Sequence, residues 1–174
     1  KMSTRKAQYI TLDELIDEVG SDVVRYFFIM RGINTHLNFD MVLAKNESDE
    51  NPVYYLQYAH ARLCNILKHA DSQGYILDKK VDLTYLKLDS EISLIKLLLE
   101  FPNIIVKTKN NLEPQTIATY LQNLAGKFHK YYAKERIVTK DTAKTVARLV
   151  LVRALQIVLS NGLSVLGINA PKKM

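Results

Sequence analysis

The sequence has 174 residues, of which 48% are hydrophobic, and this length suffices for a helical domain that buries most of its apolar surface. The net charge of +6 and the isoelectric point near 9.3 favour a polyanionic partner, because lysines and arginines that neutralise phosphates release counterions. We find no run of about 20 apolar residues that could span a bilayer and no signal peptide, so no membrane role is expected.

The beginning of the chain predicts three short helices. Thr11 and Glu14 have the spacing of a capping box at the start of the first helix. Ser21 is expected to cap the second helix, whose residues are largely apolar. Asp40 is expected to cap a third helix that continues to Lys45.

A wholly polar segment, residues 46–51, follows these helices, and we place a domain boundary there. Pro52 suits the first turn of the next helix, because proline lacks the N–H that a first turn leaves unpaired. Apolar residues then recur at steps of three and four over about five helical turns. They are Leu56, Ala59, Leu63, Ile66, Leu67 and Ala70. The chain is therefore divided into residues 1–48 and residues 49–174.

The second part predicts further helices that prolines separate. Asp89 is expected to cap one that Pro102 interrupts, and Pro114 is expected to open the next. The last helix should run from about Thr142 to Ser160. No segment alternates with a period of two residues, so the predicted fold class is all-α: a helical bundle preceded by a short helical segment.

The sequence lacks the motifs of a self-contained nucleotide-binding or metal-binding domain. It has no Gly-rich phosphate loop, and its histidines and single cysteine lack the spacing of metal ligands. Cys64 is interpreted as a buried structural thiol of a reducing cytoplasm. A nucleophilic pair of Cys64 and His60 would have no third group to orient it, so this chain is not expected to be an enzyme by itself.

Three segments, read in order, carry a resemblance to a known family. Residues 1–6 read KMSTRK, residues 51–62 read NPVYYLQYAHAR, and residues 101–171 combine aromatic, leucine and glycine positions. The first is similar to the KMSKS loop, the second to a long signature and the third to the helical anticodon-binding domain of arginyl-tRNA synthetase. Two positions depart from the family pattern. Ala7 stands where the family has glycine, and the second KMSKS lysine is missing at Thr4.

The resemblance implies that the chain is the C-terminal, anticodon-binding part of an arginine–tRNA ligase, cut at the start of its KMSKS-type loop. In the full enzyme Lys1, Met2 and Ser3 would face ATP, and Lys1, Arg5 and Lys6 would bind the nucleotide and meet charge on the leaving pyrophosphate. Either Arg5 or Lys6 could replace the missing lysine.

The resemblance also implies the cofactors and partners of the full enzyme. It would use ATP and Mg²⁺ in the cytoplasm, whereas the fragment alone is expected to be inactive and to bind no cofactor or metal. The expected partners are the anticodon stem-loop of tRNA-Arg and the missing catalytic domain, with the chain as a monomer. Residues 1–48 would form a stem-contact segment and residues 49–174 the anticodon-binding domain.

Unpaired RNA bases are usually read by stacking on aromatic rings and guanidinium planes. The resemblance places the base-reading pocket in the last two long helices and the C-terminal tail, where the candidates are Tyr120, Tyr132, Arg148 and Met174, with Arg136 expected to meet phosphates. For Tyr120 and Tyr132 the alternative is packing in the core. Arginine codons, CGN and AGR, imply anticodons that share only a middle cytosine, so a reader of all of them must recognise that base.

The sequence leaves alternatives open for one face of the helix that begins at Pro52 and for the function of the whole chain. The face of Tyr54, Tyr58 and Arg62 could pack against the preceding helices or form a seam along which the tRNA arm passes. The whole chain could be a helical protein-interaction module without an RNA role, or the anticodon domain of a related synthetase such as the cysteinyl enzyme. A linear dependence of log affinity on log salt would favour RNA binding.

Overall fold

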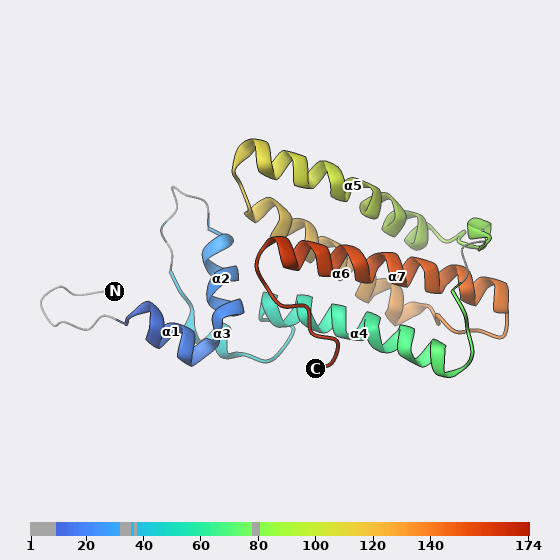
Figure 1. Cartoon of the computed structure of the whole chain (residues 1–174), viewed down its shortest axis with the longest axis horizontal. Helices are drawn as coiled ribbons and strands as arrows, with labels where there is room; N and C mark the ends of the chain where they lie inside the picture. Colours follow the sequence, from blue (N-terminus) through green and yellow to red (C-terminus); the bar gives the residue numbers. More distant parts are fainter. Residues whose placement is uncertain (1–9, 32–35, 37, 78–80) are drawn as a thin grey trace, which may run out of the picture.

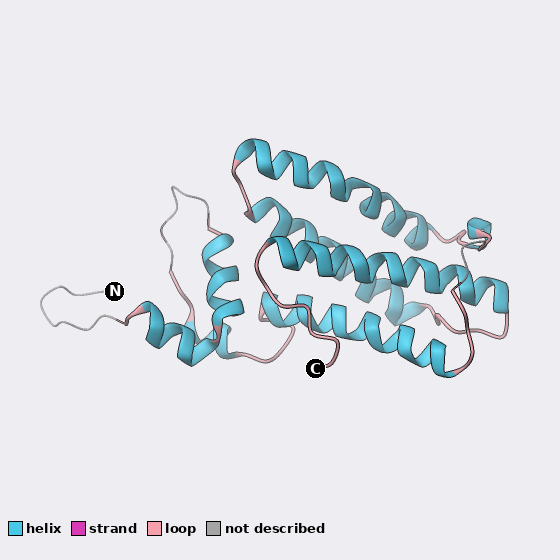
Figure 2. Ribbon diagram, in the orientation of Figure 1, coloured by secondary structure: helices cyan, strands magenta, loops and turns pink. Residues whose placement is uncertain are grey.

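The computed structural model describes residues 10–31, 36, 38–77 and 81–174. Within these ranges the chain consists of helices and loops with no strand, which confirms the all-α prediction (Figure 2). The KMSKS-type residues Lys1, Met2, Ser3, Arg5 and Lys6 lie outside the described residues. The expectation that they face ATP therefore stays a prediction.

Four long helices form an elongated bundle, and three short helices lie at one end of it (Figure 1). The long helices are α4 (Pro52–Ser72), α5 (Asp89–Asn111), α6 (Gln115–Lys134) and α7 (Thr142–Val165). The short ones are α1 (Leu12–Val19), α2 (Ser21–Ile29) and α3 (Met41–Lys45), and a 3-10 turn, η1 (Leu83–Tyr85), precedes α5.

The core lies between the long helices. Leu63 of α4, Phe128 of α6 and Leu155 of α7 are fully buried. Burying one such side chain contributes about 1.5–3 kcal/mol. Tyr26 of α2 is also fully buried, and α2 packs on both α4 and α6. The short helices are thereby attached to the bundle.

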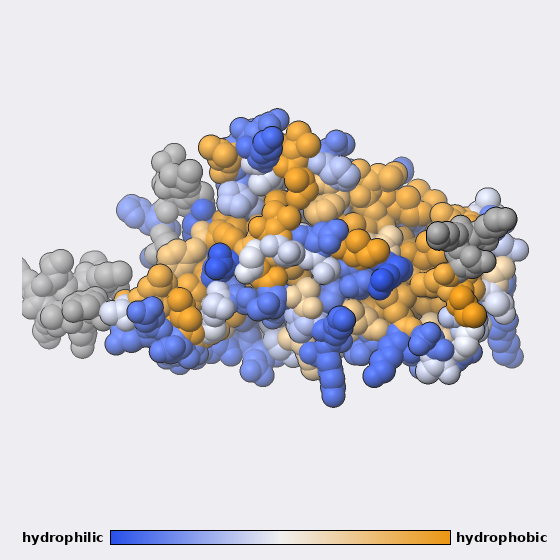
Figure 3. Space-filling view, in the orientation of Figure 1, coloured by the Kyte–Doolittle hydropathy of each residue, from blue (hydrophilic) through white to orange (hydrophobic). Residues whose placement is uncertain are grey.

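Helix α7 is long and apolar enough to cross a membrane by length and composition, contrary to the sequence expectation. Half of its most apolar window is buried inside the bundle, so core packing accounts for that composition. On the face shown in Figure 3, apolar side chains are exposed along α5 and α7, whereas polar side chains gather along the edge formed by α4.

The starts of the short helices follow the sequence signals with one exception. Thr11 N–H donates to Glu14 Oε2 at 2.8 Å and Glu14 N–H to Thr11 Oγ1 at 3.2 Å, which confirms the capping box. Asp40 Oδ1 caps α3, as predicted. Ser21 is not a cap but the first residue of α2, because Gly20, at φ 85°, ends α1 and precedes α2 directly.

Helix α5 differs from the prediction at two places. Asp89 is its first residue rather than its cap, because Glu91 Oε2 accepts a hydrogen bond from Leu88 N–H at 3.1 Å and fixes the start there. Pro102 lies inside the helix and does not interrupt it. Pro102 is exposed, so water can replace the backbone hydrogen bond that proline cannot make.

Helices α6 and α7 each differ slightly from the prediction. Pro114 is the N-cap of α6, one residue before the helix begins. Helix α7 continues past Ser160 to Val165, through Gly162. A Cβ at Gly162 would lie only 2.6 Å from Leu121 Cδ2, so this glycine permits close approach of α6 and α7 rather than ending the helix.

A buried side chain in the loop after α3 connects the short helices to the bundle. Asn51 is 3% exposed, its Oδ1 accepts from Val53 N–H at 3.0 Å, and its Nδ2 donates to Ala44 O at 3.1 Å. Asn51 thus caps α4 and connects it to α3. The proposed boundary between residues 1–48 and 49–174 stays a prediction.

Candidate functional site

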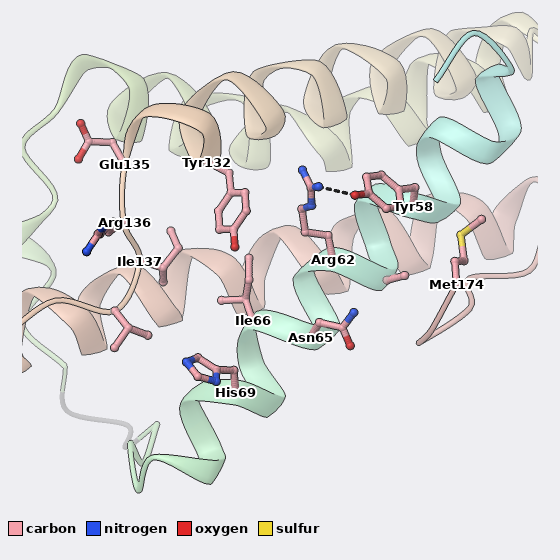
Figure 4. Close-up of a pocket in the computed structure, with 12 residues that line it drawn as sticks. Tyr58, Arg62, Asn65, Ile66, His69, Tyr132, Glu135, Arg136, Ile137 and Met174 are labelled. Atoms are coloured by element: carbon pink, nitrogen blue, oxygen red, sulfur yellow. Dashed lines mark hydrogen bonds between the residues drawn. The ribbon is translucent and has the colours of Figure 1, made fainter. Parts of the chain in front are cut away.

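The main candidate site is a cleft of about 570 Å³ between α4 and the end of α6 (Figure 4). Apolar residues form part of its lining, and polar side chains, aromatic side chains and one methionine from three parts of the chain form the rest. They are Tyr58, Arg62, Asn65 and His69 of α4, Tyr132, Glu135 and Arg136 at the end of α6 and in the following loop, and Met174 of the tail.

Helix periodicity explains the α4 wall. Tyr58, Arg62, Asn65 and His69 recur at steps of three and four and therefore share one face of the helix. The buried stripe that includes Leu63 faces the core instead. Helix α4 therefore presents one apolar and one polar side, and the polar side forms the cleft.

Arg62 connects the two walls of the cleft. Its guanidinium carbon lies 4.5 Å from the ring centroid of Tyr58 and 5.4 Å from that of Tyr132, within the range of cation–π attraction. An Arg62 Nη2 also donates to the Tyr58 hydroxyl (Figure 4). The two tyrosines are 36% and 37% exposed, so a planar cation and two rings share a surface that solvent can reach.

His129 supports this arrangement from behind. Its ring stacks on Tyr58 with centroids 6.0 Å apart, and its Nδ1 lies 3.5 Å from Arg62 Nη1. Burial, and then the charge of Arg62, lower the pKa of His129 from 6.5 to about 4. His129 is therefore neutral at neutral pH, and its Nδ1 can accept a hydrogen bond from Arg62.

The C-terminal tail, residues 166–174, is held to α4 by a hydrogen bond before it reaches the cleft. His60, 2% exposed, donates from Nδ1 to Pro171 O at 2.8 Å, and its Nε2 accepts from Gln156 Nε2 at 2.9 Å. Met174 follows and lines both this cleft and a second one, of about 510 Å³, between α4 and the short helices. Cys64 is only partly buried, contrary to expectation, and burial raises the pKa of its thiol.

Two predicted contact residues lie in the interior and need correction. Tyr120 is 6% exposed, burial raises its pKa to about 12, and its hydroxyl donates to Leu97 O at 2.8 Å. Its ring stacks on Phe101 inside the protein. Arg148 is 1% exposed. Neither side chain offers a face on which an unpaired base could stack.

Arg148 instead holds the loop at the rim of the cleft. Its Nε donates to Glu91 Oε1 at 2.8 Å, its Nη2 to Glu135 Oε2 at 2.9 Å and its Nη1 to Arg136 O at 2.6 Å. Tyr131 also donates to Glu91 Oε1, at 2.9 Å. This buried network fixes the backbone from which Arg136 extends into solvent.

Comparison with known families decides what kind of domain carries this cleft. The family described as "DALR anticodon binding domain" matches residues 56–174. The chain belongs to this family. The match includes every residue that lines the cleft.

Several relatives of this DALR domain are arginine–tRNA ligases, also called arginyl-tRNA synthetases. Over its whole length the chain is 46% identical to the arginine–tRNA ligase of Desulforamulus reducens and 48% identical to that of Salinibacter ruber, covering 31% of each. The solved arginyl-tRNA synthetase of Thermus thermophilus superposes with a TM-score of 0.77 at 27% identity, over 98% of this chain and 29% of that one. The chain thus spans less than a third of the length of these proteins. The resemblance to arginyl-tRNA synthetase is confirmed.

The DALR fold brings together three of the five residues predicted to contact RNA. Tyr132, Arg136 and Met174 line one cleft, although their contacts with RNA stay predictions. Asn65 and His69 are not among the residues predicted to contact RNA, and the sequence suggests Arg62 only as part of a seam along which the tRNA arm passes. Their helical spacing with Tyr58 was the signal in the sequence that could have identified them.

Proposed function

We propose that this chain is the part of an arginine–tRNA ligase that binds the anticodon arm of tRNA-Arg, with unpaired anticodon bases entering the cleft between α4 and α6. The observation that supports this most is the placement of Arg62 between Tyr58 and Tyr132 at a solvent-accessible surface. Aromatic rings and guanidinium planes stack on unpaired bases, and each base–aromatic stack is worth about 1–3 kcal/mol. The DALR family and the arginine–tRNA ligase relatives agree with this function.

Recognition of the middle cytosine requires groups that pair with its edge. The Asn65 amide, which lines the cleft, offers both an N–H donor and a carbonyl acceptor, and these complement the N3 acceptor and N4 amino group of cytosine. Arg136 is exposed at the rim and suits a phosphate. Asn65 would thus supply specificity, and Arg136 would supply affinity that does not depend on sequence.

The proposal includes the ligase as a whole. It would attach arginine to tRNA-Arg with ATP and Mg²⁺ in the cytoplasm, and Lys1, Met2 and Ser3 together with Arg5 and Lys6 would act at the nucleotide. This chain by itself, as a monomer, would bind tRNA without catalysing arginine-dependent exchange of pyrophosphate into ATP.

Fluorescence anisotropy with a labelled tRNA-Arg anticodon stem-loop tests the location of the site. Tyr132→Ala should weaken binding by about tenfold, which corresponds to one lost stack. Tyr85→Ala is the matched control, because Tyr85 is 40% exposed on η1 and does not line the cleft. Arg136→Gln should reduce the steepness of the salt dependence by about one phosphate contact. If Tyr132→Ala binds like Tyr85→Ala, the bases do not stack in this cleft.

A further inference from the structure

Helix α6 carries a second polar surface on the flank that faces α5. A groove of about 240 Å³ lies between the start of α5 and the end of α6. Lys127, Lys130 and Lys134 line it from α6, and Ser90 and Ser93 line it from α5. The lysines recur at steps of three and four and so share one face of α6.

Among the described residues, the lysines of this groove have no acidic partner. Helix α6 contains no acidic residue from Gln115 to Lys134. Within the described part of the chain, no carboxylate lies within salt-bridge distance of Lys127, Lys130 or Lys134. Lys127 Nζ donates to Ser93 Oγ at 2.8 Å, a neutral partner that leaves the ammonium charge free.

Glu135 is the one carboxylate that lines the groove in the part of the chain that the structure describes, and it is already paired. Glu135 Oε2 accepts from Arg148 Nη2 at 2.9 Å, and Arg148 is itself buried. Glu135 also lines the cleft, so the two surfaces meet at this residue. Tyr132 contacts Arg62 of α4, whereas Lys127 contacts Ser93 of α5, so the cleft and the groove occupy the two flanks of α6.

We propose that this groove, lined by Lys127, Lys130, Lys134, Ser90 and Ser93, binds the ribose-phosphate backbone of the same RNA arm whose loop occupies the cleft. Ammonium groups and serine hydroxyls are common donors to phosphate oxygens, and such contacts position RNA without reading sequence. Because the groove adjoins the cleft at Glu135, an arm bound in the cleft can cross the exposed side of α6 and reach the lysines. This inference rests on the proposed function.

The test replaces charges without disturbing the core. Lys130→Gln/Lys134→Gln removes two exposed lysines and leaves the Lys127–Ser93 hydrogen bond intact. The matched control is Lys107→Gln/Lys109→Gln, two exposed lysines at the end of α5, outside both surfaces. Each pair of substitutions removes the basic residue in the last turn of its helix, so the loss of interaction with the helix dipole is similar in the variant and in the control.

The measurement is anisotropy across a salt series with two labelled stem-loops, the tRNA-Arg loop and one with a changed middle base. Two lost phosphate contacts should lower the magnitude of the slope of log affinity against log salt by about 1.4–1.8. At moderate salt both loops should bind Lys130→Gln/Lys134→Gln at least about tenfold more weakly, by the same factor. The control should keep the wild-type slope and affinities.

The outcomes separate this inference from the proposed function. If the wild type prefers the tRNA-Arg loop but Lys130→Gln/Lys134→Gln titrates like the control, the groove does not bind RNA while the proposed function stands. If the affinity loss comes with an unchanged slope, the groove makes no phosphate contact. If the wild type binds neither loop, the proposed function fails, and the inference falls with it.

Discussion

Arg148→Met should remove a large part of the stability of this domain. The change deletes three hydrogen bonds, to Glu91, Glu135 and the carbonyl of Arg136. Glu91 is 0% exposed, so its carboxylate would stay buried without a cation. Removing one partner of a buried ion pair typically costs about 3–5 kcal/mol. Many domains have only about 5–15 kcal/mol of stability, so the variant should fold but unfold at clearly lower denaturant.

Urea unfolding followed by far-UV circular dichroism measures this loss. Arg153→Met is the matched control on the same helix, because Arg153 is exposed and should change stability by about 0.5 kcal/mol or less. Adding Glu91→Gln to Arg148→Met should recover about 2 kcal/mol, since a neutral amide is less costly to bury without a cation. Amide exchange of residues 135–138 should accelerate in Arg148→Met, because the rim of the cleft loses its support.

Two results together would contradict a stabilising role of Arg148. If Arg148→Met unfolds within about 1 kcal/mol of the wild type, and if Glu91→Gln adds its own cost independently, the buried network does not stabilise the fold. The rim of the cleft would then be held by other contacts.

Three further predictions concern other positions. Gly162→Ala should destabilise the fold by about 1–3 kcal/mol in urea unfolding, because its Cβ would meet Leu121, whereas Gly126→Ala meets only ordinary contacts and should be neutral or stabilising. The pKa of His129 is lowered to about 4, so the folded state favours the neutral imidazole. After allowance for partial exposure, this contributes about 1–2 kcal/mol to the free energy of unfolding. The contribution is complete above pH 6.5 and is lost as the pH falls towards 4. In urea titrations the free energy of unfolding of His129→Gln should fall less between pH 6.5 and pH 4 than that of the wild type. If both proteins show the same dependence on pH, His129 does not make this contribution. Asn51→Ala should lower the thermal midpoint, with a loss of about 1–2 kcal/mol, because it removes the cap of α4, and an unchanged midpoint would refute that role.

Local signals in the sequence predicted most of the fold. Capping residues such as Thr11 and Asp40 act within one turn, so their effect can be read from neighbouring residues. The predicted interruption at Pro102 and the predicted end of α7 near Ser160 were wrong, because both depend on surroundings that are distant in sequence. Pro102 is tolerated because its side of α5 faces solvent, and Gly162 is required by Leu121 of another helix.

The candidate site was only partly predictable for a similar reason. Residue type suggested Arg148 as an RNA contact, but its partners Glu91 and Glu135 lie on or next to other helices and are distant in sequence. The helical position of Arg148, in register with the buried Val152 and Leu155, was the available sign that it faces the core.

The surface that carries the proposed function depended on tertiary packing. The contact between Arg62 and Tyr132 joins two helices, and no pattern in either segment alone predicts it. Composition could indicate a basic, RNA-binding protein, whereas the particular aromatic and guanidinium groups exposed together became apparent only in the folded chain.

This chain is proposed to recognise the anticodon of tRNA-Arg. The most direct test is the affinity of the unmodified protein for two anticodon stem-loops that differ only in the middle base, at one salt concentration. A specific pocket should bind the loop with the middle cytosine at least about tenfold more tightly, since each mismatched polar contact typically costs about 1–3 kcal/mol. Equal affinity for both loops would contradict recognition of the anticodon.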